Sequence, residues 1–422
     1  MNRTRGRRPL GVRSLGVPSL GVPSLLVVGL LLSSGCRYSG ELGPDVMTMA
    51  RADSLAHAAI IADANILTPY RLTLDTASVW SATGWGEFDH PRAMQGGLDV
   101  AVMGMLIPSR HEEAGDAVEV ATARLDEWHG IVEAHPDRFR LLRSPDDVRN
   151  AAEDGVLGLV FAIENGIPIG SGVEGIEPLY DRGVRLITLV HSSPNGLGDS
   201  SYSQERPWGG LSPLGRDVVG VMNRRGMIID VSHMADPTVA DVLEVSRAPV
   251  IASHSSVRAF TPGWERNLSD ELIEGIARGG GVIHVAFGGS FLSTELQQRE
   301  QPMWDHVEQT LGLSINSLRG RAEAMGFRAD NGVERATISD LADHVDHIVD
   351  LVGVGHVGLG SGFDGSGDAM LDGLRDVSGY PALIAELMRR GYGDEDLEKL
   401  LGGNFLRVWS EVESLAGQIS GL

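Results

Sequence analysis

The fold of this 422-residue chain is decided by two stretches, GMIIDVSH at residues 226–233 and PVIASHSS at residues 249–256. Each contains a short run of Ile, Val, Met or Ala, which is typical of a strand buried on both faces of a parallel sheet. Each run is followed within a few residues by a histidine. The amphipathic segment between them, expected to be helical at 237–245, completes a strand–helix–strand unit.

The same alternation continues through most of the chain. Eight short apolar runs are expected to be strands, at residues 59–62, 98–105, 157–163, 186–190, 227–231, 250–252, 281–285 and 357–359. Apolar residues at helical spacing predict helices at residues 117–134, 213–225, 237–245, 269–278 and 338–351. Eight units favour a closed (β/α)8 barrel of the TIM type over an open doubly wound sheet. No Gly-x-Gly-x-x-Gly follows the first run, which argues against dinucleotide binding.

We expect one barrel domain at residues 51–415, with an insertion around 288–331 that contains no strand-like run. Residues 1–35 are typical of an export signal, with a basic start and an apolar stretch before Cys36. Cys36 is the only cysteine and indicates lipid attachment, with residues 36–50 as a tether. The expected location is therefore the bacterial cell envelope, on its periplasmic or extracellular face. Plain secretion and an uncleaved anchor are the alternatives.

Composition excludes several classes of function. The formal net charge is −22, and removal of residues 1–35, which hold five arginines and no acid, would leave −27. A chain this acidic repels phosphate backbones, so we expect no nucleic-acid partner. One cysteine near the N-terminus excludes an internal disulfide and a cysteine-based zinc site. The only lysine is Lys399, in a C-terminal helical stretch, which argues against a Schiff base or carboxylated-lysine chemistry.

Polar side chains stand where four of the predicted strands end. Glu164 and His191 follow the third and fourth runs, and His233 and His254 follow the fifth and sixth. Catalytic residues of such barrels lie at the carboxyl ends of the strands. One carboxylate and two imidazoles make a good ligand set for Zn²⁺, with positions left for water and substrate. The alternative for each histidine is a hydrogen-bonded residue of the core.

The chain resembles the membrane (renal) dipeptidase family, peptidase family M19, over residues 52–409. The matching segments are HPR at 90–92, GGLD at 96–99, FAIENG at 161–166, LITLVH at 186–191, DS at 199–200, GMIIDVSH at 226–233, PVIASHSS at 249–256, RNL at 266–268 and GGNFLR at 402–407. The resemblance implies an amidohydrolase-like enzyme that cleaves dipeptides with a metal-activated water and two zinc ions. It also implies a small peptide substrate and, in many relatives, a homodimer.

Roles carry over by match to five residues. Glu164 corresponds to the carboxylate that bridges both metals, and His233 and His254 complete the second metal site. His191 corresponds to the histidine that steadies the tetrahedral intermediate. Arg266 corresponds to the arginine that binds the substrate carboxylate, a role that the bidentate guanidinium suits.

The chain departs from the family pattern at three positions. The first strand of the family ends in Asp-x-His-x-Asp, whereas this chain has Asp63-Ala64-Asn65-Ile66-Leu67. The last strand of the family ends in Gly-Ser-Asp-Phe-Asp-Gly, and Gly362 replaces its first aspartate, the proton shuttle. Asp364 remains two residues further on, on the same face of a strand, and we expect it to substitute in part for the shuttle. We therefore expect a single zinc ion held by Glu164, His233 and His254. Two classes of function remain open: a metallo-dipeptidase, and a catalytically impaired binding or scaffold protein at the cell surface.

Overall fold

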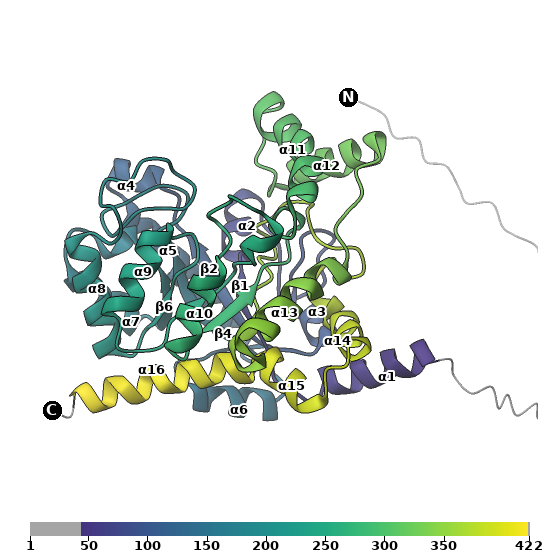
Figure 1. Cartoon of the computed structure of the whole chain (residues 1–422), viewed down its shortest axis with the longest axis horizontal. Helices are drawn as coiled ribbons and strands as arrows, with labels where there is room; N and C mark the ends of the chain where they lie inside the picture. The colour runs from purple at the N-terminus through teal and green to yellow at the C-terminus, as the bar shows by residue number, and fades with distance from the viewer. Residues whose placement is uncertain (1–43, 421–422) are drawn as a thin grey trace, which may run out of the picture. The chain divides into compact units, whose positions relative to one another are not determined.

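Parallel strands form the centre of the molecule, and helices surround them (Figure 1). The computed structural model describes residues 44–420. Its strands are β1 (Ile61–Ile66), β2 (Leu98–Leu106), β3 (Phe139–Leu141), β4 (Leu157–Glu164), β5 (Val184–Thr188), β6 (Ile228–Asp230), β7 (Ile251–Ala252), β8 (Val282–Val285) and β9 (Val357–Leu359). β2 pairs with β1 on one side and with β4 on the other, so the sheet closes on itself. The predicted (β/α)8 barrel is confirmed.

The strand β3 was not predicted. It pairs with the first residues of β4 and lies outside the ring of eight, since β2 and β5 are the barrel neighbours of β4. A run of only three residues shows no periodicity that a sequence pattern could detect. β1 also differs from the prediction, because it spans Ile61–Ile66 rather than 59–62. Asp63 and Asn65 have low strand propensity, yet all six residues of β1 are buried.

The helices follow the strands in the order expected of such a barrel. They are α1 (Pro44–Ala56), α2 (Thr68–Leu74), α3 (His90–Gly96), α4 (Arg110–Ala114), α5 (Ala117–Ala134), α6 (Pro145–Glu153), α7 (Ile176–Asp181), α8 (Pro213–Arg225), α9 (Asp236–Val245), α10 (Asp270–Arg278), α11 (Thr294–Trp304), α12 (Leu318–Asn331), α13 (Ile338–Val352), α14 (Tyr380–Arg389), α15 (Asp394–Glu398) and α16 (Asn404–Ser420). The bounds of α5 and α8 are those predicted.

The helix caps show where local sequence signals hold. The Ser212 hydroxyl accepts a hydrogen bond from the Gly215 amide at 2.9 Å and caps α8, as its sequence indicates. The next helix, predicted at residues 237–245, begins one residue earlier at Asp236, and Ala235 is its cap. The Asp236 carboxylate pairs with Arg258, whose Nη2 lies 2.5 Å from Oδ1. A tertiary ion pair has here replaced a local cap.

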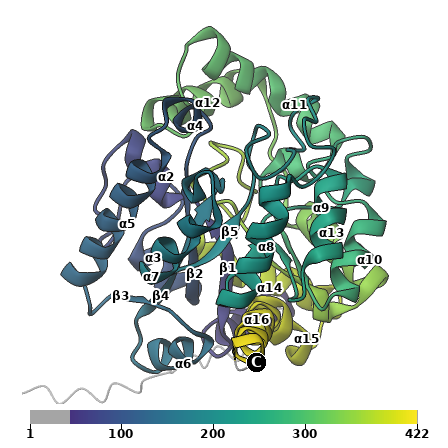
Figure 2. The same cartoon turned by 90° about the vertical axis from the view of Figure 1, so that its left-hand side faces the viewer.

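Two apolar layers hold the barrel. The inner layer contains Val100 and Val102 of β2 and Val160 and Ala162 of β4, and it packs against Trp409 and neighbouring residues of α16. The outer layer contains the alternate residues of the same strands, which face the surrounding helices. In Figures 1 and 2, α16 crosses one end of the barrel, and α11 and α12 lie beyond the other end. α16 thus covers the end of the barrel at which the strands begin.

Two segments of the structure can be compared with the expected tether and the expected insertion. α1 begins at Pro44, so residues 44–50 form helix where a polar tether was expected; their helix packs through Ala52 and Ala56 against the outer layer. α11 and α12 lie within the expected insertion at 288–331. Cys36 and the expected export signal lie outside the described residues. Within residues 44–420, no helix is both long enough and apolar enough to span a bilayer.

Candidate active site

Glu164 is the last residue of β4 and points into the mouth of the barrel. Val160 and Ala162 of the same strand face the interior, and the two-residue period of a strand places Glu164 on that face. Asn165, which follows it, has a left-handed backbone with φ of 81°. Its amide nitrogen donates to the Ile107 carbonyl at 2.9 Å, and its amide oxygen accepts from Asn195 at 2.9 Å. These bonds fix the direction in which β4 presents the carboxylate.

Three imidazoles converge on one oxygen of that carboxylate. The distances from Glu164 Oε1 to Nε2 are 3.2 Å for His191, 3.5 Å for His233 and 3.6 Å for His254. Glu164, His191 and His233 present ligand atoms within 4.8 Å of one another. His254 joins them, since its Nε2 lies 2.8 Å from Nε2 of His233. The structure therefore brings together all four strand-end residues that the sequence singled out.

Burial and mutual proximity set the charge of this group. Burial lowers the pKa of His233 well below its ordinary value, and the nearby Arg266 and His191 lower it further. Burial likewise lowers the pKa of His254 to about 4. Burial alone would raise the pKa of Glu164, but His254 and the other imidazoles outweigh it and hold the pKa well below the usual range. At neutral pH the set is one carboxylate with neutral imidazoles at His233 and His254.

Buried hydrogen bonds hold the imidazole of His254 and the backbone of His233 in place. Asp230, at the end of β6, accepts from the Ser253 hydroxyl at 2.6 Å and from the Ser253 amide at 2.7 Å. The Ser253 hydroxyl lies 2.7 Å from Nδ1 of His254. His233 has a left-handed backbone with φ of 69°, and its carbonyl accepts from the Ser201 amide. Carboxylates and hydroxyls behind a histidine commonly orient it toward a metal ion.

The other oxygen of Glu164 faces Asn65 rather than a second metal-binding group. The amide nitrogen of Asn65 lies 3.2 Å from Glu164 Oε2 and 2.6 Å from Nδ1 of His254. A Cβ on Gly104 would lie 2.9 Å from the Asn65 oxygen and 2.8 Å from Leu67. Asn65 and Leu67 thus fill the space beside Glu164 against the Gly104 backbone, and Leu67 offers no ligand atom. These residues do not fit a second metal ion.

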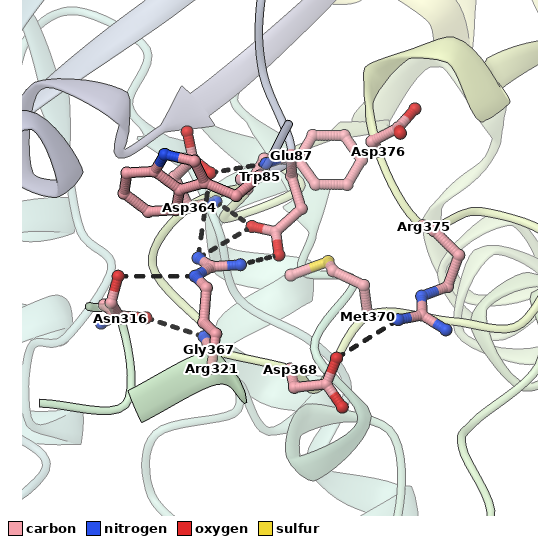
Figure 3. Close-up of polar contacts among 12 residues, drawn as sticks. Trp85, Glu87, Asn316, Arg321, Asp364, Gly367, Asp368, Met370, Arg375 and Asp376 are labelled. Atoms are coloured by element: carbon pink, nitrogen blue, oxygen red, sulfur yellow. Dashed lines mark hydrogen bonds and ion pairs between the residues drawn. The ribbon is translucent and has the colours of Figure 1, made fainter. Parts of the chain in front are cut away.

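The expectation that Asp364 partly replaces the missing proton shuttle is wrong. Asp364 is fully buried, and its Oδ1 lies 3.0 Å from Arg71 and 2.7 Å from the Glu87 amide. Its Oδ2 accepts from Thr68 at 2.7 Å. Figure 3 shows Glu87 and Arg321 beside Asp364, and Arg321 Nη2 lies 3.1 Å from Glu87 Oε2. Spacing along a strand could not predict these three partners, which come from other segments.

Asp63 also stands apart from the metal-binding group. Its Oδ1 accepts from the amides of Asn65 and Ser361, and the Tyr380 hydroxyl donates to its Oδ2 at 2.6 Å. Burial raises its pKa to about 6 despite these bonds. Its carboxylate oxygens link β1, the segment after β9 and α14 through these hydrogen bonds.

Arg266 lies in the loop between β7 and α10 and lines the same cavity as Glu164. Its Nη1 donates to the Ser255 hydroxyl at 2.8 Å, and its Nη2 donates to the His254 carbonyl at 2.7 Å. Its Nε is buried and has no hydrogen-bond partner within the described residues. These two bonds leave three of the five guanidinium donors, and the guanidinium also hydrogen-bonds the Tyr202 side chain in the cavity wall. The predicted carboxylate-binding arginine is therefore placed beside the predicted metal site.

The cavity has a volume of about 540 Å³ and contains residues that the sequence analysis missed. Tyr202, Trp264 and Phe291 add aromatic walls, and α11 with the following turn adds a polar wall. Nothing in their local sequence distinguishes them from surface or core aromatics. Their position becomes clear only after the loops that follow β5, β7 and β8 are folded over the barrel mouth.

Comparison with known proteins agrees with this geometry. Residues 49–421 match the family model described as membrane dipeptidase, peptidase family M19. The chain belongs to this family. Dipeptidase tcpJ of Claviceps purpurea (strain 20.1) is 31% identical over 344 residues, which cover 80% of this chain and 72% of the relative. Dipeptidase verJ of Clonostachys rogersoniana is 33% identical over 303 residues, which cover 71% and 67%.

Solved structures of the family share the fold. The probable dipeptidase PvdM from Pseudomonas aeruginosa superposes with a TM-score of 0.73 and 28% identity, covering 88% of this chain and 99% of that one. A metallo peptidase from Rhodobacter sphaeroides, liganded with a phosphinate mimic of the dipeptide L-Ala-D-Ala, gives a TM-score of 0.70 and 25% identity. That match covers 84% of this chain and 99% of the other. The M19 member described here is thus a dipeptidase-like metallohydrolase by fold and family.

Proposed function

We propose that this M19 protein hydrolyses dipeptides with a free C-terminal carboxylate, using one divalent metal ion, zinc, held by Glu164, His233 and His254. The observation that carries the proposal is one cavity lined both by these three residues and by Arg266. A carboxylate anchored on the guanidinium would bring the peptide bond of a short substrate toward the imidazole cluster. The phosphinate dipeptide mimic bound by the Rhodobacter sphaeroides relative supports the same substrate class.

The residues fit one ion. Glu164 Oε1 is buried and has no hydrogen-bond partner among the described residues, although it faces three ring nitrogens. A single carboxylate with neutral imidazoles is a common ligand set for Zn²⁺ in catalytic sites. One carboxylate also balances one divalent ion better than two, since Asn65 and Leu67 contribute no charge. The single-metal proposal therefore rests on the ligand count and on the amide that occupies the neighbouring space.

When bound, a divalent ion supplies polarisation of the peptide carbonyl and a more acidic water. His191 lies beside Glu164 with its side chain partly exposed to the cavity, where it is placed to donate a hydrogen bond to the oxyanion that develops on the carbonyl. Such a donor is commonly worth about 3–4 kcal/mol. Arg266 holds the substrate carboxylate through its remaining N–H groups. Gly362 carries no side chain to move a proton, so we expect slow turnover.

The proposal is tested by supplying the purified full-length protein with Zn²⁺, Mn²⁺ or Co²⁺ and measuring hydrolysis of a dipeptide panel by amino-acid release. We expect turnover that Glu164→Ala abolishes. A control is Glu295→Gln, an exposed carboxylate outside the cavity lining. Absence of turnover with every metal, in a protein that still binds one ion, would contradict the dipeptidase proposal and favour a binding protein.

We also propose that Cys36 carries a lipid anchor that holds the protein at the bacterial cell envelope. The support is the apolar stretch at 25–32 followed by small residues and cysteine. Cys36→Ser should move the protein from the membrane fraction to the soluble fraction, and unchanged membrane association would count against the anchor. The homodimer suggested by the resemblance is measured by sedimentation of the same purified protein.

A further inference from the structure

One wall of the active-site cavity is polar and comes from a single helical segment. Gln297 and Gln301 of α11, with Asp305 and Glu308 of the following turn η5 (Asp305–Thr310), line the same cavity as Glu164 and Arg266. Their spacing of four, four and three residues returns to the same side of a helix. We call Gln297, Gln301, Asp305 and Glu308 the acidic wall. Figure 1 shows α11 beyond the end of the barrel opposite to α16.

The four acids of α11 and η5 divide into two kinds. Glu295 pairs with Arg299 at 2.6 Å, and Glu300 pairs with Arg328 at 3.0 Å; neither lines the cavity. Asp305 and Glu308 line the cavity, and in the described part of the chain neither is within 4.0 Å of a basic group. Asp305 accepts only amide hydrogen bonds, from Gln301 at 2.9 Å and from Gln309 at 2.8 Å. The acids left without a cation are thus those that face the substrate space.

Other residues of the same cavity indicate that it binds a ligand. Arg266 Nε and Glu164 Oε1 belong to residues only 2% exposed, and both atoms lack a hydrogen-bond partner among the described residues. Trp264 and Trp304 also line the cavity, and indole faces favour cations. A volume of about 540 Å³ lies in the range that encloses a drug-sized ligand, which leaves room beyond a small dipeptide.

We infer that the acidic wall recognises a cationic group on the N-terminal side of the scissile bond, so that the preferred substrate is a short peptide with a basic N-terminal part. The inference rests on the proposed function, because it assumes that the substrate carboxylate lies at Arg266. With that end fixed, the amino-terminal part of the peptide extends away from the guanidinium toward the remaining walls. The cation is either a Lys or Arg side chain or the α-amino group of a longer peptide, which are chemically equivalent here.

The experiment compares matched peptides on the metal-loaded full-length protein. Lys-Ala against norleucine-Ala tests a basic side chain, and Gly-Gly-Ala against acetyl-Gly-Ala tests an extended amino group. We expect kcat/KM to favour the cationic member of at least one pair by about twofold to fivefold, since a partly exposed charge pair contributes up to about fivefold. Asp305→Asn with Glu308→Gln should abolish that preference and leave norleucine-Ala nearly unchanged. Glu295→Gln, on the same helix but outside the cavity, should keep it.

Binding of non-hydrolysable phosphinate analogues of Lys-Ala and norleucine-Ala, measured by calorimetry, separates this inference from the proposed function. Tighter binding of the lysine analogue that is lost in the double variant and weakened by salt supports the acidic wall even where no hydrolysis occurs. Hydrolysis of dipeptides with equal kcat/KM in both pairs, and equal affinity for both analogues, would overturn the inference while the dipeptidase proposal stands.

Discussion

The amide nitrogen of Asn65 lies 3.2 Å from Oε2 of Glu164, while the other oxygen of that carboxylate faces three imidazoles. A neutral donor thus satisfies the oxygen that would bridge to a second ion in a two-metal site. Because an amide hydrogen bond adds no charge, Glu164 keeps its full negative charge for one cation. This contact is consistent with the proposed single-metal site, because it gives Oε2 a hydrogen-bond partner in place of a second ion.

Restoring the three departures from the family pattern should restore the second metal. In Asn65→His with Leu67→Asp and Gly362→Asp, we expect two ions per chain and a rise in hydrolysis of roughly a hundredfold or more, the scale of general acid–base help. A Cβ at Gly362 would meet only Ser366 Oγ, at 3.5 Å, and aspartate tolerates its φ of 67° better than most residues. The control is the same triple variant with Leu67→Asn in place of Leu67→Asp. Unchanged metal content in the triple variant would show that other residues exclude the second ion.

Arg266→Lys keeps the charge and removes the forked geometry. We expect kcat/KM for dipeptides with a free carboxylate to fall by roughly tenfold to a hundredfold, the loss of one charge-assisted hydrogen bond. Most of the effect should appear in KM, because the carboxylate contact exists before the reaction starts. C-terminally amidated dipeptides, which lack the carboxylate, should be poor substrates of both proteins. Equal loss for free and amidated dipeptides would instead mean that Arg266 only supports His254.

Asp364→Asn should destabilise the protein rather than alter its chemistry. The change leaves the fully buried Arg71 guanidinium without its ion partner, which typically costs about 3–5 kcal/mol. Asp376→Asn in the same segment is the control, since Asp376 pairs with the partly exposed Arg92 and should cost under about 1 kcal/mol. Urea unfolding measures both. Normal stability with loss of hydrolysis would place Asp364 in proton transfer after all.

Asp99 gives a pH dependence of stability with a definite sign. Burial raises its pKa from an ordinary value of 3.8 to about 6, although the Ile61 amide donates to it at 2.9 Å. The folded state therefore favours the protonated acid. Ionisation of Asp99 lowers the free energy of unfolding, and this loss is absent below pH 4 and complete above pH 6. Asp99→Asn keeps an acceptor for Ile61 and should add about 2 kcal/mol of unfolding free energy at pH 7 but little at pH 4, after allowance for its partial exposure. A constant difference between the two proteins across this range would contradict the assignment.

Sequence patterns predicted the barrel because its strands are apolar on both faces and its helices carry strong periodicity. They also identified Glu164, His191, His233 and His254, since the strand-end rule of such barrels needs only the strand positions. β3 escaped detection because three residues carry no period. The helical start of α1 escaped because its first turns are polar or exposed and only Ala52 and Ala56 reach the core.

The partners of isolated acids could not be predicted. The two-residue spacing along a strand suggested that Asp364 shares the face of the missing shuttle, but Arg71, Glu87 and Thr68 reach it from other segments. Whether Asp305 and Glu308 are paired also depends on which arginines the fold brings near. Long-range ion pairs join residues hundreds of positions apart, and local sequence patterns do not predict them.

The most direct test is the ratio of metal to protein in the unmodified chain, measured by elemental analysis after loading with excess Zn²⁺ and removal of free ions. We predict one ion per chain, which Glu164→Ala, His233→Ala and His254→Ala each remove and which Asp364→Asn retains in its folded fraction. Two tightly bound ions per chain, or one ion that survives loss of Glu164, would contradict the proposed single-metal site.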